Sequence, residues 1–221
     1  MALAGKGAII IWNDITPEGR DQFYDWHLHE HIPERLSVPG FLRGGRYIAA
    51  SPDTKPEFLT LYEIDGPSVA TSAPYLARLN NPTDWTKRAT ADFRNTARAL
   101  TEVVRSEGEG PGGVMGTVSF GDAATLERIN VGASAIVETA RMPRITGAHL
   151  CLTNNAASAA KTVESENRPD IVTAPIGAVL IEGCDAAAVQ AATSQLLKAC
   201  GIDRTQLQVG LYALEHVRSS R

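Results

Sequence analysis

An internal repeat is the feature of this sequence that most constrains its fold. The first half ends in LTEVVRS (100–106) and the second half ends in ALEHVRS (213–219). Upstream of these, PEFLTLYE (56–63) and PIGAVLIE (175–182) each carry a Glu seven residues after a Pro. Farther upstream, SVPGFLRGGRYIAA has a looser counterpart in RMPRITGAHLCLTN. Three matches in the same order predict a tandem repeat of one structural unit.

The Gly-rich stretch SEGEGPGG, near the centre of the chain, is the most linker-like segment. It separates two expected repeats, residues 1–106 with the candidate active site and residues 113–221 as a degenerate copy. Apolar alternation and helix-start signals predict the order β-α-β-β-α-β in each half, which is the ferredoxin-like arrangement. The expected strands are 7–13, 42–50, 58–65, 96–105, 114–120, 145–153, 176–182 and 207–217, and the expected helices are 17–37, 67–79, one from 122, and 185–199.

Two ferredoxin-like sheets in one chain can face each other and bury surfaces that each would otherwise expose. The expected fold class is therefore α+β, with tandem ferredoxin-like repeats forming a pseudo-dimeric α/β barrel within one chain. Such a chain completes its barrel alone, so any homodimer is expected to use other surfaces.

Composition and charge exclude several classes of protein. The 221 residues are 43% apolar and 21% charged, and 21 basic against 25 acidic residues give a formal charge of -4. Without a basic stripe interleaved with aromatics, nucleic acid is not an expected partner. No apolar run reaches the roughly 18 residues that span a bilayer, so a cytoplasmic protein without a membrane partner is expected. Three Cys without Cys-x-x-Cys spacing indicate reduced thiols.

Aromatic residues are concentrated in the first half. All three Trp, four of five Tyr and four of five Phe precede residue 112, as do His27, His29 and His31. Aromatic side chains with polar ends suit a ligand pocket, although they are equally typical of a larger core. We therefore expect the pocket in the first half and a structural role for the second.

The stretch FYDWHLHEHIPERLSVPGF, residues 23–41, carries these histidines. At about 100° per residue, one helix face presents His27 and His31 together, and His29 points away from them. The same face also carries Phe23, Trp26, Glu30 and Glu34. Because Pro33 lacks an N–H and its ring clashes with the preceding turn, a kink is expected there.

Three interpretations of this face are open. His27, Glu30 and His31 spell H-x-x-E-H, the inverted zinc-protease motif, although Pro33 breaks the helix just beyond it. Alternatively, both histidines are structural residues, packed or paired with Glu30 or Glu34. In the third interpretation one histidine is a general acid/base, because imidazole both accepts and returns protons near neutrality, and Glu34 or Glu30 sets its tautomer.

A run of residues in this region resembles the EthD-like branch of the dimeric α/β-barrel superfamily. The run consists of Phe23, Trp26, His31, Pro33, Pro39, Gly40, Arg46 and Tyr47. The resemblance implies a pocket between the sheet and the helices of one ferredoxin-like unit, and His31 matches the family histidine. It also implies action on cyclic or aromatic small molecules, for the most part without a metal.

The expected function is that of a small-molecule enzyme of the isomerase, cyclase or lyase type, acting on a hydrophobic cyclic, aromatic or lactone substrate without metal or cofactor. His31 is the expected proton carrier. The expected catalytic group is completed by His27, Glu34 and Tyr47, and the expected substrate-binding residues are Phe23, Trp26, Arg46, Tyr62 and Trp85. The alternatives are a non-catalytic ligand-binding or oxygenase-accessory protein with the same cavity, and a haem-dependent enzyme.

Overall fold

A computed structural model describes residues 3–220 of the chain. The first half consists of β1 (Gly7–Ile15), α1 (Arg20–Trp26), the π-helical turn η1 (His27–His31), α2 (Ile32–Leu36), β2 (Phe41–Ala49), β3 (Phe58–Ile64), the 3-10 turn η2 (Pro67–Thr71), α3 (Ala73–Asn80), α4 (Asp84–Thr90) and β4 (Phe93–Gly108). The second half consists of β5 (Val114–Phe120), α5 (Ala123–Val131), α6 (Ala133–Ala140), β6 (Ile145–Thr153), α7 (Asn155–Ser158), α8 (Val163–Glu166), β7 (Gly177–Gly183), α9 (Ala186–Ala199), the 3-10 turn η3 (Arg204–Gln206) and β8 (Gln208–Ser219).

The eight strands form one closed antiparallel barrel in the order β1-β3-β2-β8-β5-β7-β6-β4. Each half contributes four neighbouring strands, and the order β4-β1-β3-β2 in the first half matches β8-β5-β7-β6 in the second. The two sheets join where β2 pairs with β8 and where β4 pairs with β6. This arrangement confirms the predicted fold class, a pseudo-dimeric barrel within one chain. The expected sheets therefore meet at both edges as well as facing each other.

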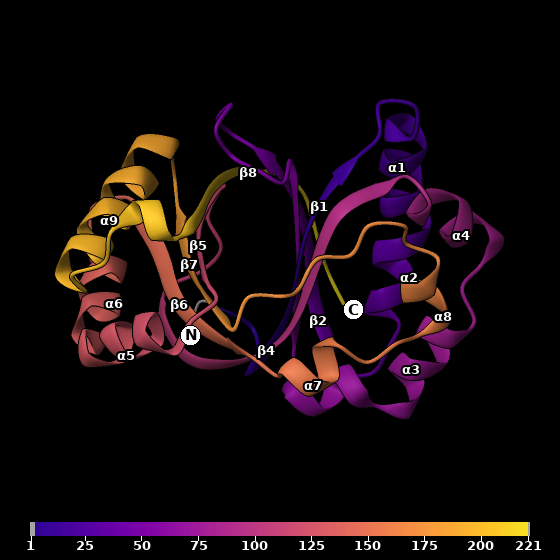
Figure 1. Ribbon diagram of the computed structural model, residues 1–221, viewed down its shortest axis with the longest axis horizontal. Coiled ribbons are helices and arrows are strands. Elements are labelled where there is room, and N and C mark those ends of the chain that lie inside the picture. Colours follow the sequence, from indigo (N-terminus) through magenta and orange to yellow (C-terminus); the bar gives the residue numbers. More distant parts are fainter. Residues whose placement is uncertain (1–2, 221) are drawn as a thin grey trace.

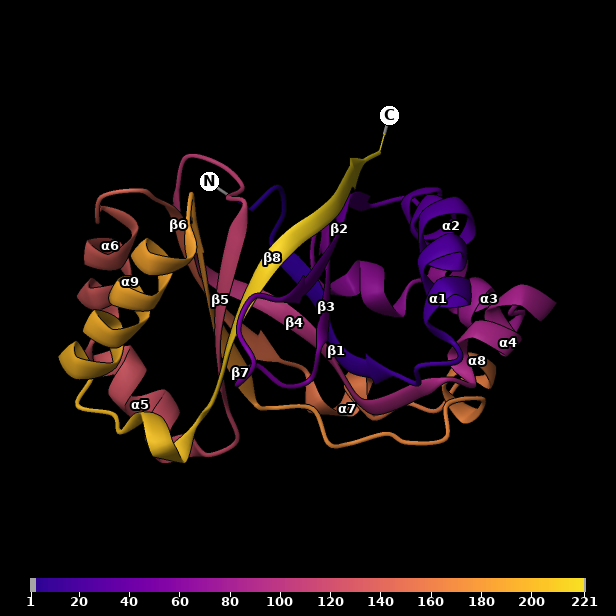
Figure 2. The ribbon, with the colours of Figure 1, turned by 90° about the horizontal axis from the view of Figure 1, so that it is seen from above.

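Strand alternation creates two distinct surfaces on the barrel. Ile10 and Trp12 of β1 pack into the barrel interior with Leu59 and Leu61 of β3. Ile9 of the same strand points outward to the helices of the first half. Those helices cover one side of the barrel, and α5, α6 and α9 cover the opposite side (Figures 1 and 2). Apart from α7 and α8, which lie against the first half, the helices of each half therefore pack on the outside of its own four strands.

The helix that carries the histidines differs from the expected one at its middle. In place of a kink at Pro33, a π-helical turn precedes the proline, and the N–H of Ile32 bonds to the carbonyl of His27. A proline in a helix interior removes one hydrogen bond and crowds the preceding turn, and a wider turn relieves that crowding. The widened turn spans His27–His31, so the proline acts directly on the backbone of the candidate site.

The long connection between β6 and β7, residues 154–176, was not predicted from the sequence. Its counterpart in the first half, residues 50–57, is much shorter. The long connection crosses from the second half to the helices of the first half, where α8 lies beside α4 (Figure 1). It pairs with β4 through an isolated bridge between Thr96 and Ile171. Helix α4 was also missed. Across residues 3–220, the helices are all too short or too polar to traverse a bilayer.

Candidate functional site

His27 and His31 lie side by side on the buried face of the turn η1, the face that contacts the sheet. Both side chains are buried, and their rings stack with centroids 5.6 Å apart. The His31 ring also packs on the Trp26 ring, with centroids 4.2 Å apart. His29 is exposed. The predicted shared face of His27 and His31, with His29 directed away, is confirmed.

Several polar atoms in this region are buried without a hydrogen-bond partner among the described residues. They are the Nδ1 atoms of His27 and His31, the hydroxyl of Tyr62 and Nε of Arg168. The Tyr62 ring lies edge-on to His31 at 6.3 Å. Most buried polar groups in proteins are hydrogen-bonded, so a group of unpartnered ones indicates a place where water or a ligand completes the bonding.

Both histidines are held neutral by their surroundings. Burial is the main cause that lowers the pKa of His31 well below 6.5, followed by the positive charge of Arg35, then His27 and Arg168. The pKa of His27 is lowered by burial and by Arg46. A neutral imidazole has one ring nitrogen free to accept a hydrogen bond or a proton, and the charged groups that lower the pKa of His31 are cationic.

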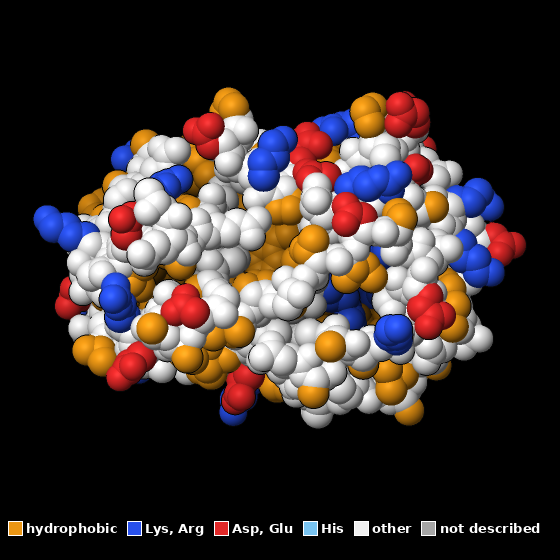
Figure 3. Space-filling view, in the orientation of Figure 1, with side chains coloured by type: hydrophobic (Ala, Val, Ile, Leu, Met, Phe, Trp, Pro, Cys, Tyr) orange, Lys and Arg blue, Asp and Glu red, His pale blue; other side chains and the backbone are white. Residues whose placement is uncertain are grey.

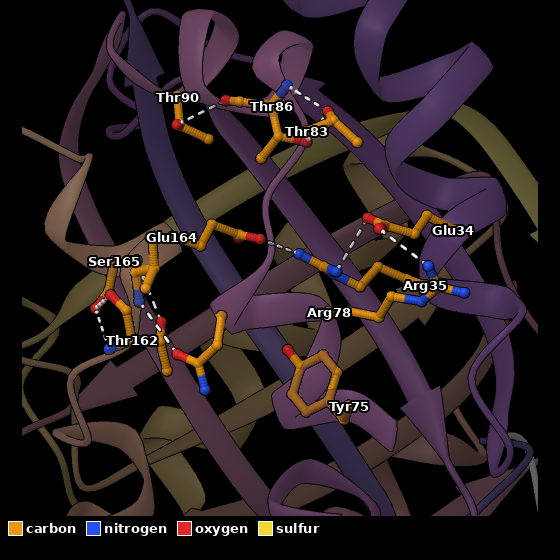
Figure 4. A network of polar contacts seen from close by, with 12 residues as sticks. Glu34, Arg35, Tyr75, Arg78, Thr83, Thr86, Thr90, Thr162, Glu164 and Ser165 are labelled. Atoms are coloured by element: carbon orange, nitrogen blue, oxygen red, sulfur yellow. Dashed lines mark hydrogen bonds and ion pairs between the residues drawn. The ribbon is translucent and has the colours of Figure 1, made fainter. Parts of the chain in front are cut away.

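A buried ion triad of Arg35, Glu164 and Arg168 joins the two halves, and Figure 4 shows its contact between Arg35 and Glu164. The Arg35 guanidinium donates to Glu164 of α8, and Arg168 donates to the other oxygen of the same carboxylate at 2.8 Å. Burial alone would raise the pKa of Glu164, but the charges of Arg35 and Arg168 outweigh it and hold that pKa below its usual range. Glu164 is therefore an anion that bridges two arginines.

Neither acid expected beside the histidines bonds to them. Glu34 pairs with Arg35 at 3.2 Å and lies 3.9 Å from Arg78. Glu30 accepts hydrogen bonds from the hydroxyls of Thr83 and Thr86 (2.6 and 3.1 Å). The expectation that Glu34 or Glu30 fixes a histidine tautomer is therefore wrong for this arrangement, because arginine and threonine compete for those carboxylates.

The H-x-x-E-H interpretation requires the acid of the motif to share a site with both histidines. Glu30 is directed to α4 instead, where it bonds to Thr83 and Thr86. Among residues 3–220, no group of three His, Cys, Asp or Glu side chains has a spacing suited to a metal ion. The residues of the motif thus do not fit the zinc site that its spacing suggests.

Tyr47 lies on the wrong face of the sheet for the role expected of it. Its ring packs inside the barrel with Trp12 and Tyr212, whereas His31 lies outside the barrel. Neighbouring residues of a strand point to opposite faces, so Arg46 and Tyr47 do not serve one site. Arg46 is the residue on the helix side, where it pairs with Glu215 at 3.0 Å and lies over the Tyr24 ring.

The aromatic residues expected to contact substrate form a packed wall. Phe23 and Trp26 pack with Phe58 and Phe93, and Trp85 lies against the same cluster. The Trp26 indole N–H donates to the hydroxyl of Thr86 at 3.1 Å. This cluster holds the helix against the sheet and packs around the two histidines, and its contact with substrate stays a prediction.

A cavity of about 480 Å³ lies beside the triad. Thr96 and Arg98 of β4 line one side, and the other described lining residues all belong to the connection, between Asn155 and Ala174. Figure 3 shows this face hollowed, with basic atoms recessed between α7 and α8. The expectation that first-half residues dominate the pocket is therefore wrong for this cavity. The long connection between β6 and β7, which belongs to the second half, packs on β4 of the first half and supplies most of the lining.

Arg168 connects the cavity with the histidines. It lines the cavity, bonds to Glu164, lies 5.4 Å from the centre of the Phe93 ring and helps to lower the pKa of His31. Sequence reasoning missed Arg35, Arg98, Glu164 and Arg168. One signal was present for Arg35, which follows His31 by four residues and so lies on the same helix face. For Glu164 and Arg168 no local pattern indicated a contact with the first half.

Comparison with known proteins identifies the fold. No family model matches the sequence, and no curated protein sequence matches it. An anthrone oxidase-like protein superposes with a TM-score of 0.63 at 9% identity, covering 100% of this chain and 96% of that chain. A candidate monooxygenase from Fusobacterium nucleatum superposes with a TM-score of 0.58 at 8% identity, covering 98% of this chain and 96% of that chain. A haem-binding protein from Thermus thermophilus superposes at 0.52 with 10% identity, covering 96% and 92%. The chain has the dimeric α/β-barrel fold, with both halves of the barrel in one polypeptide.

Proposed function

We propose that this protein is an enzyme that moves a proton on a hydrophobic cyclic or aromatic small molecule, with His31 as the base. The observation that carries the proposal is the buried, unpartnered Nδ1 of a neutral His31 beside the unpartnered Tyr62 hydroxyl and Arg168 Nε. A buried polar group left without a partner costs stability, on the order of 1–3 kcal/mol, and a bound ligand that bonds to the group removes that cost.

The proposed step is proton abstraction next to a carbonyl. The C–H bond of the substrate breaks, its proton goes to Nδ1 of His31, and its electron pair moves onto the carbonyl oxygen to form an enolate. The Tyr62 hydroxyl and the Arg168 guanidinium donate hydrogen bonds to that oxygen. Because both donors are in place before the reaction, they do not have to reorient when negative charge develops on the oxygen. Return of the proton at another carbon yields an isomer, and loss of a leaving group yields a lyase product.

His27 is assigned a positioning role. Its ring stacks between Phe23 at 5.2 Å and His31 at 5.6 Å, which fixes the orientation of the His31 imidazole. A rigid base held near its productive geometry contributes to rate because little rearrangement precedes proton transfer. The role of Glu34 is indirect, since it contacts Arg35 rather than a histidine.

Substrate reaches the base from the cavity in this proposal. Arg168 lies at the boundary between the cavity and the aromatic wall around His31, so it is the residue where a ligand in the cavity comes nearest to that wall. A volume of about 480 Å³ falls within the roughly 300–1,000 Å³ typical of small-molecule pockets. The description of one structural neighbour as anthrone oxidase-like agrees with a polycyclic substrate.

Haem does not fit the cavity as it is lined. The described lining residues include no His, Cys, Met or Tyr to ligate iron. A ligand-binding protein without catalysis is the second candidate, because the cavity is formed whether or not His31 reacts.

Exchange of substrate protons with solvent tests the proposal. In D2O, the protein should accelerate deuterium incorporation at the α carbons of 2-tetralone, a bicyclic ketone, as followed by NMR. His31→Asn should lower this rate by roughly 10²- to 10⁴-fold, as expected for loss of a general base. His29→Asn is the matched control on the exposed side of the same turn and should keep the rate. A folded His31→Asn protein with unchanged exchange would leave ligand binding as the function.

A further inference from the structure

The arginines around the cavity are not balanced by carboxylates. Arg35 is flanked by Glu34 and Glu164, and Arg168 shares Glu164 with it. Arg98 is half-buried and has no carboxylate within ion-pair distance among the described residues; its guanidinium donates only to the Tyr75 hydroxyl, at 3.0 Å. A cation withdrawn from water without an anion is costly, so this imbalance points to a negatively charged ligand.

The cavity surface carries the groups that would receive such a ligand. Arg98, Arg168 and Lys161 line it, together with the hydroxyl-bearing Thr96. Thr96 Oγ1 and Arg168 Nε are both buried, and neither has a hydrogen-bond partner among the described residues. Two residues that line the cavity therefore each carry a buried polar atom without a partner among the described residues.

Apart from Asn155, Ser158, Ser165 and Thr173, the rest of the cavity is apolar. Ile171, Val172 and Ala174 form one wall, and Ala159 and Ala160 lie on another. Ile171 is exposed, with 56% of its surface accessible to water, and Val172 is 43% exposed. A ligand that covers these side chains removes apolar surface from water, which stabilises the complex by roughly 25 cal/mol for each Å² covered.

We propose that the cavity binds an apolar molecule bearing one carboxylate, which Arg98 and Arg168 hold while the apolar body covers Ile171 and Val172. This rests on the proposed function, because it names the substrate class of the same site. A guanidinium matches a carboxylate in a fork of two parallel hydrogen bonds, which a lysine does not provide. The pKa of Arg168, lowered by burial and by repulsion from Arg98 and Arg35, agrees with an excess of positive charge here.

Binding of matched aromatic ligands tests this assignment without requiring turnover. Isothermal titration of the full chain should show saturable binding of 2-naphthoate, and binding at least tenfold weaker of 2-acetylnaphthalene, its uncharged counterpart of similar size. Arg98→Gln should weaken naphthoate binding at least tenfold and leave binding of the ketone nearly unchanged. Arg88→Gln, an exposed arginine on α4 outside the cavity, is the control and should bind like the unmodified protein.

Three results would each overturn the assignment. They are equal affinity for 2-naphthoate and 2-acetylnaphthalene, no saturable binding of 2-naphthoate, and equal naphthoate affinity of Arg98→Gln and Arg88→Gln. Melting curves of both variants show whether weaker naphthoate binding reflects unfolding. Lys161→Gln gives a second test at an exposed side chain of the cavity, and it should weaken naphthoate binding two- to fivefold. His31→Asn separates the two proposals, because it should retain naphthoate binding even if it loses proton exchange. Failure of the binding test leaves the His31 result untouched.

Discussion

The guanidinium of Arg35 donates to the carboxylate of Glu164, and this bond ties helix α2 of the first half to helix α8 of the second. Both side chains are almost completely removed from water. The two halves of the repeat are therefore not independent around the candidate site. The second half supplies one of the two acids that pair with Arg35, a residue whose charge lowers the pKa of His31.

Removal of that acid should destabilise the protein strongly. Glu164→Gln leaves Arg35 and Arg168 without their shared carboxylate, and breaking a buried ion pair on one side costs roughly 3–5 kcal/mol in the free energy of unfolding. Glu166→Gln, on the same short helix but exposed, should change it by less than about 0.5 kcal/mol. Urea unfolding of both variants at neutral pH measures the difference, and equal stabilities would show that the triad is not a source of stability.

The loss caused by Glu164→Gln should depend on pH. The pKa of Glu164 is held below 4.5 in the folded protein, so the carboxylate contributes stability above its ordinary pKa and that contribution disappears as pH falls through the folded pKa. The difference in the free energy of unfolding between the unmodified protein and Glu164→Gln should therefore become smaller below about pH 4.5. A constant gap down to acid unfolding would contradict the assignment of Glu164 as the anion of the triad.

Much of the fold could be predicted from the sequence because it depends on local patterns. The repeat predicted the pseudo-dimeric barrel, and strand β5 at Val114–Phe120 and strand β6 at Ile145–Thr153 were predicted with the correct bounds. Apolar alternation and turn residues specify these strands without long-range information. The spacing of His27 and His31 likewise predicted a shared face, because helix geometry alone determines it, whereas their burial was not predicted.

The candidate site was less predictable because distant segments build it. The connection 154–176 has neither strong alternation nor a helical stripe, and its partners Arg35 and Arg98 lie far away in the sequence. The pairing of Arg35 with Glu164 follows only from the closed barrel. The joint assignment of Arg46 and Tyr47 to one site was avoidable, since adjacent strand residues point to opposite faces.

The buried histidines should make stability fall on the acid side of neutrality. The pKa of His31 is well below 6.5 in the folded protein, so between its folded pKa and about 6.5 the unfolded chain binds more protons and stability decreases as pH falls. Each such histidine contributes a slope of up to about 1.4 kcal/mol per pH unit. His31→Asn should reduce the slope measured by urea unfolding across this window. The exposed-residue variant His29→Asn should show the slope of the unmodified protein.

The same pKa shift predicts where proton exchange activity persists. If His31 is the base, it stays unprotonated at pH values where a free imidazole is largely charged, so the acid limb of kcat/KM for exchange should lie well below pH 6.5. Rates of 2-tetralone exchange measured across the stable pH range, with melting curves at each pH, test this. An acid limb near 6.5 in folded protein would indicate that an exposed histidine, rather than His31, is the base.

Tyr62 separates a catalytic from a structural interpretation of the unpartnered atoms. Its buried hydroxyl has no partner among the described residues, so Tyr62→Phe removes a desolvated polar group and should leave the free energy of unfolding unchanged or raise it slightly. If the hydroxyl stabilises the enolate, the same variant should lower the exchange rate by roughly 10- to 100-fold, because one preorganised donor is lost.

Tyr212→Phe is the matched control for this experiment. Its hydroxyl is also buried, but it lies inside the barrel and donates to the carbonyl of Pro56 at 3.1 Å. Its loss should cost about 1 kcal/mol of stability and leave exchange unchanged. The two variants should therefore show opposite patterns, with activity reduced in one and stability reduced in the other. A Tyr62→Phe protein as active as the unmodified one would remove Tyr62 from the mechanism and leave Arg168 as the donor to the developing charge.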